Sequence, residues 1–252
     1  MIGIGSPAFC MTPFPKMLEE IARDFKLWEI LSEGEDRLEL IGDGVRQGRD
    51  SYDMRYQVHA PLSDVNIGSV YEPMRQAAMK EVMQTIALCH RLEIPLVTIH
   101  PGFVQGIAFL DRGKAVEKTR ESVKVLAEFS RRNSVEIVLE NLPANINATC
   151  TTASELLEVL EGTDLRICFD LGHANTASQI DELLALVGRF GNVHLHNNSG
   201  QWDQHNKVDD GSADIRKVVS VLKKSYKGNM IIEATDLETG AVSKSVLEHL
   251  LR

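Results

Sequence analysis

The sequence lacks several features that would assign it to large classes of proteins. Its 252 residues include only four cysteines, which lie far apart and form no CxxC pair, so neither disulfides nor a thiolate zinc site is expected. Eight prolines and no low-complexity tract leave no linker, which predicts a single domain over residues 1–252. No stretch reaches the roughly 18 apolar residues of a membrane span, and the N-terminus has no secretion signal. We therefore expect a cytoplasmic protein without membrane contact.

Basic residues are also in the minority. The chain has 27 Lys and Arg against 36 Asp and Glu, which gives a formal net charge of −9. The acidic residues are scattered, so nothing offers a long basic surface to nucleic acid. Nucleic acid is expected as a partner only if a local basic groove or bound metal ions supply positive charge.

Short runs rich in Val and Ile alternate with longer amphipathic stretches along the whole chain. The predicted strands are 2–6, 27–31, 54–60, 95–100, 135–140, 166–170, 192–196 and 230–234. The predicted helices lie near 14–24, 36–41, 71–92, 112–132, 152–161, 178–188, 214–224 and 241–251. Eight strand–helix units in a chain of this length predict a closed (β/α)8 TIM barrel, because an open doubly wound sheet usually has fewer units.

Polar side chains finish six successive predicted strands, from the third to the eighth. They are His59, His100, Glu140, Asp170, His194 and Glu233. Active sites of this architecture lie at the C-terminal ends of the strands. Carboxylates and imidazoles that converge there are costly to bury unless a cation neutralises them. Oxygen and nitrogen ligands without thiolate suit zinc, manganese, magnesium or iron, so the sequence predicts a divalent metal site.

Residues 193–205, VHLHNNSGQWDQH, concentrate three of the eight histidines. The period of two along a strand directs His194 and His196 to the same side, toward the rim. The following loop can fold back so that Asp203 and His205 complete a second metal site, near His173 after strand six. In the same loop, Trp202 is a candidate wall of a substrate pocket, or simply a loop anchor. Lys207 is the best candidate for binding phosphate, the alternative being a solvated lysine.

With these residues in place, the chain resembles the xylose isomerase-like TIM barrels, the superfamily that includes endonuclease IV and many sugar isomerases and epimerases. The resemblance covers essentially the whole chain, and it depends on the order and spacing of short motifs. They are VHAP at 58–61, IHPG at 99–102, LEN at 139–141, FDLGH at 169–173, VHLH at 193–196, WDQH at 202–205 and IIE at 231–233.

The resemblance implies two alternative metal sites. In members similar to endonuclease IV, nine residues hold three zinc ions, and their counterparts here are His59, His100, Glu140, Asp170, His173, His194, Asp203, His205 and Glu233. In the sugar isomerases and epimerases, the counterparts of Glu140, Asp170, His194 and Glu233 bind one divalent ion. There the two glutamates act as acid and base, and His59, His100 and His205 would orient substrate hydroxyls. The chain satisfies both templates, with one to three zinc or manganese ions.

Departures from the endonuclease pattern favour the isomerase alternative. The first loop, PAFCMTPFP, has no glycine, HAP is followed by Leu62 and Ser63 where a Tyr is usual, and Asn197 stands where many relatives have Asp. We therefore predict a metal-dependent isomerase or epimerase of a small sugar or sugar phosphate, working through an enediolate. The alternative is a zinc-dependent phosphodiesterase similar to an apurinic/apyrimidinic-site endonuclease. A third hypothesis is a non-enzymatic barrel in which the metal has only a structural role. A homo-oligomer is compatible with all three hypotheses.

Overall fold

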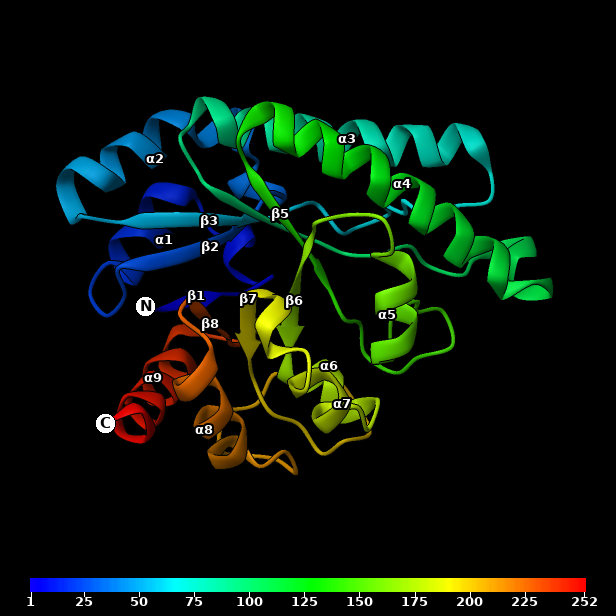
Figure 1. Cartoon of the computed structure of the whole chain (residues 1–252). Coiled ribbons are helices and arrows are strands. Elements are labelled where there is room, and N and C mark those ends of the chain that lie inside the picture. Colours follow the sequence, from blue (N-terminus) through cyan, green and yellow to red (C-terminus); the bar gives the residue numbers. More distant parts are fainter.

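The computed structural model describes residues 1–252, and its eight parallel strands close into a barrel in the order β1 to β8 (Figure 1). The strands are β1 Ile2–Gly5, β2 Leu27–Leu31, β3 Arg55–His59, β4 Leu96–Ile99, β5 Glu136–Glu140, β6 Arg166–Asp170, β7 Phe190–Leu195 and β8 Met230–Glu233. β1 pairs with both β2 and β8, which closes the sheet. The predicted TIM barrel is confirmed, and each strand lies within one or two residues of its predicted position.

Nine α-helices surround the barrel (Figure 1). They are α1 Phe14–Ile21, α2 Leu38–Tyr52, α3 Glu72–Arg91, α4 Arg112–Asn133, α5 Ala153–Val159, α6 Leu171–Thr176, α7 Ile180–Leu184, α8 Ile215–Ser225 and α9 Leu237–Leu251. Short 3-10 helices, at Phe9–Met11, Gly34–Asp36, Gly106–Leu110 and Val187–Arg189, occupy some of the loops. No helix is long and apolar enough to span a lipid bilayer.

Two helix predictions are wrong in their extent. The helix expected near 36–41 continues as α2 to Tyr52, across glycines that suggested a break. Gly48 is a point of close contact, because a Cβ there would lie 1.8 Å from Tyr56 Oη. The helix expected near 178–188 is divided into α7 and a 3-10 turn, and the additional helix α6 directly follows β6.

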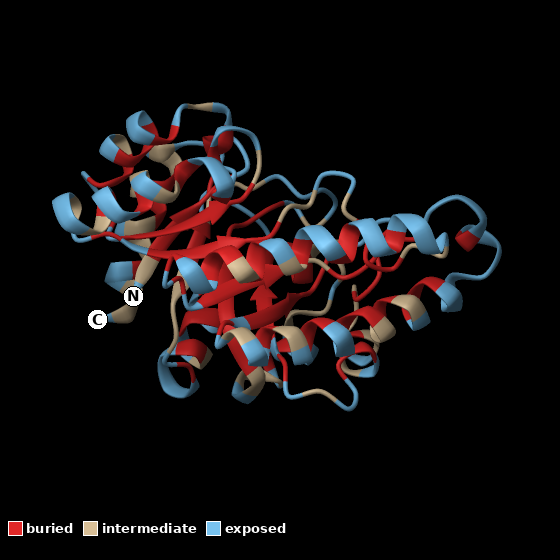
Figure 2. Ribbon diagram, turned by 90° about the horizontal axis from the view of Figure 1, so that it is seen from above, coloured by how far each residue is buried: buried red, intermediate tan, exposed pale blue.

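The hydrophobic core fills the layer between strands and helices. Figure 2 shows buried residues along the strands and exposed residues on the outer faces of the helices. Val193 and Leu195 of β7 join the main hydrophobic cluster of 59 buried residues, whereas His194 between them contacts Glu140 and Glu233 inside the barrel. The alternation predicted for this strand is therefore observed, and it directs His194 away from the helices and into the barrel.

Candidate metal-binding active site

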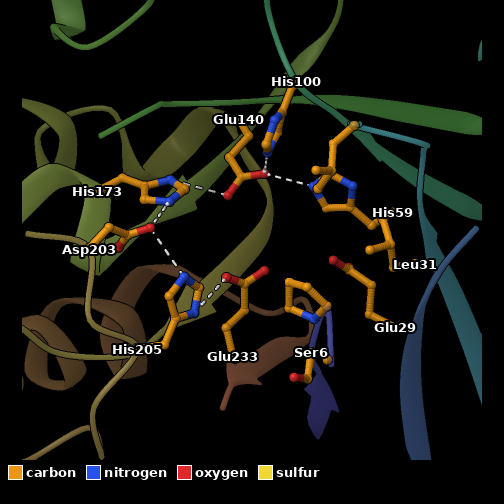
Figure 3. Close-up of a pocket in the computed structure, with 13 residues that line it drawn as sticks. Ser6, Glu29, Leu31, His59, His100, Glu140, His173, Asp203, His205 and Glu233 are labelled. Atoms are coloured by element: carbon orange, nitrogen blue, oxygen red, sulfur yellow. Dashed lines mark hydrogen bonds and ion pairs between the residues drawn. The ribbon is translucent and has the colours of Figure 1, made fainter. Parts of the chain in front are cut away.

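The C-terminal ends of the strands surround a cavity of about 180 Å³ (Figure 3). Carboxylates and imidazoles dominate its walls, and none of the lining residues is a lysine or an arginine. The lining residues are Gly5, Ser6, Pro7, Glu29, Leu31, His59, Leu62, His100, Glu140, His173, Asp203, His205 and Glu233. The recess lies at the end of the barrel where TIM-barrel enzymes carry their active sites.

Glu140, Asp170, His194 and Glu233 form the first group, called here the central cluster. His194 Nδ1 lies 3.1 Å from Glu140 Oε1 and 2.9 Å from Glu233 Oε1. One potential ligand atom from each of the four residues lies within 4.8 Å of the others. Asp170 Oδ2 is buried and has no hydrogen-bond partner. Three carboxylates around one imidazole, with a buried oxygen left unpartnered, fit a divalent cation.

Glu140 also belongs to a second group, with His59 and His100. Its Oε2 lies 3.1 Å from His59 Nε2 and 3.3 Å from His100 Nε2, while its Oε1 faces the central cluster. Figure 3 shows the two imidazoles converging on this oxygen from strands β3 and β4. The two oxygens of Glu140 are thus divided between two adjoining groups, as a carboxylate that bridges two metal ions requires.

The third group, called here the loop cluster, joins His173 of α6 to the loop after β7. Asp203 Oδ2 lies 3.1 Å from both His173 Nε2 and His205 Nε2. His196 stacks on His205 with ring centroids 4.0 Å apart and planes 3° apart. Its Nε2 lies 3.1 Å from Asp170 Oδ1, so His196 supports one residue of each of two clusters.

A fixed loop conformation delivers Asp203 and His205 to the rim. The backbones of Asn197 and Asn206 exchange two hydrogen bonds, of 3.2 and 2.9 Å. The Asn197 side chain donates to the carbonyl oxygens of Val208 and Ala213, so the amide that replaces the more usual aspartate fastens the loop. His205 itself has a φ of +50°, an uncommon conformation outside glycine, which turns its ring back over the cavity.

Backbone contacts set which imidazole nitrogen faces the cavity. Asp170 caps α6, because its Oδ1 accepts from the His173 backbone N at 2.6 Å. His173 Nδ1 lies 2.9 Å from the Asn141 carbonyl oxygen, and His59 Nδ1 lies 2.8 Å from that of Ala60. A carbonyl only accepts, so both Nδ1 atoms carry the proton and donate it. Each Nε2 faces a carboxylate oxygen, that of Asp203 for His173 and that of Glu140 for His59, so Nε2 is the nitrogen whose proton a metal ion would replace.

The electrostatics of the site are dominated by attraction between opposite charges. Burial would raise the pKa of Glu140 and Glu233, but the charges and hydrogen bonds of the surrounding histidines, His194 foremost, together outweigh it and hold both pKa values well below the ordinary range. Burial would likewise lower the pKa of His205, but Asp203 and Glu233 outweigh it and raise that pKa to about 9. Protons on the imidazoles therefore balance the carboxylates, and a bound cation would replace those protons.

The structure brings together all nine residues that the sequence singled out as metal ligands, in three adjoining clusters. It does not bring Trp202 or Lys207 to the cavity. Trp202 is 74% exposed, Lys207 is also exposed, and neither lines the cavity. Glu29 is buried and lines the cavity, and it is not among the residues predicted from the sequence. An acid in the middle of the apolar strand LWEIL is the signal that marks it.

Comparison with known proteins assigns the class. A closed eight-stranded barrel with buried His, Glu and Asp clusters at its C-terminal rim is a TIM barrel with a site suited to divalent metal. The family model described as xylose isomerase-like TIM barrel matches residues 23–251, so the chain belongs to that family.

The chain is also similar to individual proteins and solved structures. The chain is 29% identical to the uncharacterized protein MJ1311 of Methanocaldococcus jannaschii, over 99% of this chain and 88% of that protein. A crystal structure of a D-tagatose 3-epimerase-like protein superposes with a TM-score of 0.91 at 28% identity, covering 99% of this chain and 96% of the other. The D-psicose 3-epimerase of Clostridium cellulolyticum H10, crystallised with D-tagatose, superposes with a TM-score of 0.79 at 15% identity, covering 100% of this chain and 99% of the other. This likeness shows the shared fold.

Proposed function

We propose that the chain is a divalent-metal-dependent epimerase or isomerase of a small sugar. The observation that carries the proposal is the placement of Glu140 on β5 and Glu233 on β8 on either side of His194, at one cavity. Both glutamates point into the cavity (Figure 3). The relatives named as sugar epimerases support the same class of reaction.

The two glutamates can move a proton between a substrate carbon and its neighbour, or between the two faces of one carbon. One carboxylate removes the proton next to the substrate carbonyl, and the electron pair moves onto the carbonyl oxygen to give an enediolate. The other carboxyl group returns a proton, and the carbonyl forms again. A divalent ion held by the central cluster would polarise that carbonyl. The depressed pKa of both glutamates makes each an anion in the metal-free protein, so the carboxyl group that returns a proton must first take one up from water or from a neighbouring imidazolium.

The cavity favours an unphosphorylated sugar. At about 180 Å³ it is smaller than the roughly 300–1,000 Å³ typical of pockets for drug-sized ligands, which suits a single small metabolite. His59, His100 and His205 line it and can hydrogen-bond to hydroxyl groups. No lysine or arginine lines it, so a phosphate dianion would find only imidazoles and a bound cation as positive partners, among several carboxylates.

Hydrolysis of a phosphodiester is the second candidate. The observation in its favour is that the three clusters adjoin one another, with Glu140 shared between two of them, as a multi-metal hydrolytic site requires. Two observations favour the sugar instead: the cavity is small, and its lining holds no lysine or arginine that would track a phosphate backbone.

Hydrogen exchange with solvent tests the proposal. The protein, freed of metal by a chelator and then loaded with Mn²⁺ or Co²⁺, is incubated with ketopentoses and ketohexoses in D2O. Proton NMR of each sugar follows deuterium at the carbon next to the carbonyl. Exchange is expected with at least one sugar, and it should be lost in Glu233→Gln but kept in Glu238→Gln, an exposed acid on α9.

The same preparations are given a duplex oligonucleotide with one abasic site. Sugar exchange without strand cleavage supports the epimerase or isomerase. Metal-dependent cleavage without exchange of any sugar would overturn it in favour of the hydrolase. Equal exchange in the wild type and Glu233→Gln would also contradict the proposed role of the two glutamates.

A further inference from the structure

Glu29 is a buried acid whose side chain enters the barrel rather than the solvent. It lies on β2 between Trp28 and Ile30, which pack in the main core, and it is only 3% exposed. Its carboxylate lines the cavity, on the opposite side from His173 and Asp203 (Figure 3). Burying a carboxylate is costly unless each of its oxygens has a hydrogen-bond partner, so the contacts of the two Glu29 oxygens indicate what role the residue has.

One oxygen of Glu29 is saturated by neutral donors from three other strands. Oε2 accepts from Gln57 Nε2, from Asn192 Nδ2 at 2.8 Å and from Thr98 Oγ1 at 3.3 Å. These donors fix the position of the carboxylate beneath the metal clusters. They also leave Oε2 with no free lone pair for a substrate proton.

The other oxygen faces the imidazole of the central cluster. Glu29 Oε1 lies 2.8 Å from His194 Nε2. Asn192 Nδ2 is also 3.0 Å from that nitrogen, but its two hydrogens point to Glu29 Oε2 and to Thr98 Oγ1, at 3.1 Å. Nε2 therefore carries the proton and donates it to Glu29. Nδ1 faces the carboxylates of Glu140 and Glu233, which hold a second proton on it in the metal-free protein. A bound cation would replace that proton, while the proton on Nε2 would stay in the hydrogen bond to Glu29.

We propose that Glu29 is a positioning residue that holds His194 in the Nε2–H tautomer and presents Nδ1 to a divalent cation. The arrangement is a carboxylate–histidine–metal chain across the barrel, from β2 to β7. It rests on the proposed metal site of the central cluster. Glu29 lines the cavity but is not a catalytic residue, because both of its oxygens are engaged.

The variant Glu29→Gln has a specific expected effect, because an amide has one oxygen and one NH2 group. The three donors around Oε2 select the amide oxygen for that position, so the NH2 group turns toward His194 Nε2. His194 must then accept there and carry its proton on Nδ1, which blocks the cation. Loss of such a partner typically weakens metal binding about 10- to 100-fold, and we expect a loss of that size.

Calorimetric titration of chelator-treated protein with Mn²⁺ measures this effect without reference to activity. The matched control is Glu136→Gln, the same substitution at an exposed acid that begins β5, far from the cavity. We expect weaker binding in Glu29→Gln and unchanged binding in Glu136→Gln. Equal affinity in the wild type and Glu29→Gln would overturn the role of Glu29 and leave the proposed function standing. No binding by the wild type would overturn both.

A second measurement needs no Glu29 variant. Nitrogen-15 NMR of the zinc-loaded wild type identifies which ring nitrogen of each histidine carries hydrogen, and His194→Gln identifies the His194 signals by their loss. The proposal requires hydrogen on Nε2 of His194 and zinc on Nδ1. Hydrogen on Nδ1 would overturn it, even if Glu29→Gln did not fold.

Discussion

Glu140 Oε1 lies 3.1 Å from His194 Nδ1, and this contact joins β5 to β7 at the centre of the rim. The other oxygen of Glu140 faces His59 and His100. Glu140 is thus the one carboxylate shared by the central cluster and its neighbour. A substitution of Glu140 therefore affects the proposed metal site and the proposed proton transfer together. Because the side chain is buried, a substitute must also keep its volume.

We predict that Glu140→Gln abolishes turnover and leaves the fold intact, because it removes the charge and the proton carrier but keeps the volume. Removing a general base typically costs about 10²- to 10⁴-fold in rate. Steady-state kinetics on the sugar found by deuterium exchange measure the loss, and circular dichroism measures folding. The control is Glu136→Gln, an exposed acid at the opposite end of the same strand. Full activity of Glu140→Gln would exclude both candidate mechanisms.

The stability of the metal-free protein should depend on pH through His205. Its pKa is raised to about 9 by Asp203 and Glu233, above the value of about 6.5 expected when unfolded. The protonated His205 stabilises the folded state through these acidic neighbours. This stabilisation is fully present below pH 6.5 and is lost as the pH rises through 9. In the presence of a chelator, the difference in melting temperature between wild type and His205→Gln should therefore shrink from pH 6 to pH 9. A melting-temperature difference that grows from pH 6 to pH 9 would contradict the ion pairs of His205 with Asp203 and Glu233.

Gly172→Ala should disrupt the support of the loop cluster. A Cβ at Gly172 would lie 1.9 Å from Cε1 of His196, whose ring is held against His205. Overpacking of this kind typically costs about 1–3 kcal/mol, and displacing His196 also breaks its contact with Asp170. Urea unfolding measures the loss. Gly188→Ala, where nothing lies within 4 Å, is the matched control and should be neutral. Equal stability of the two variants would show that the His196 ring can move freely.

Lys207→Ala should leave kcat/KM unchanged if the substrate carries no phosphate. The side chain is exposed and does not line the cavity. Kinetics with the unphosphorylated sugar and its phosphate ester, on the wild type and the variant, test this point. Faster turnover of the phosphate ester, lost in Lys207→Ala, would show that the loop after β7 closes over a phosphate group.

The sequence was most informative where periodicity and strand ends coincide. Every strand was located because parallel strands buried on both faces appear as short continuous apolar runs. The metal-type residues followed from the rule that strand ends share one rim, and the alternation in β7 correctly directed His194 inward. α2 was underestimated because Gly48 acts through contact with Tyr56, a partner that local sequence does not reveal.

Features that depend on partners from distant strands could not be predicted. Glu29 binds groups on β3, β4 and β7, and no spacing in the sequence relates those positions. The exclusion of Lys207 from the cavity likewise depends on the path of the loop after β7, which the backbone pairing of Asn197 with Asn206 determines. The division of Glu140 between two clusters is a matter of side-chain orientation, and sequence order carries no information on it.

Anomalous X-ray diffraction from crystals grown with Mn²⁺ locates the bound ion itself. We expect a peak at the C-terminal mouth of the barrel, at bonding distance from Glu140, Asp170, His194 and Glu233. A fully occupied peak elsewhere, or no peak at the mouth while the four side chains keep their positions, would contradict the proposed metal site.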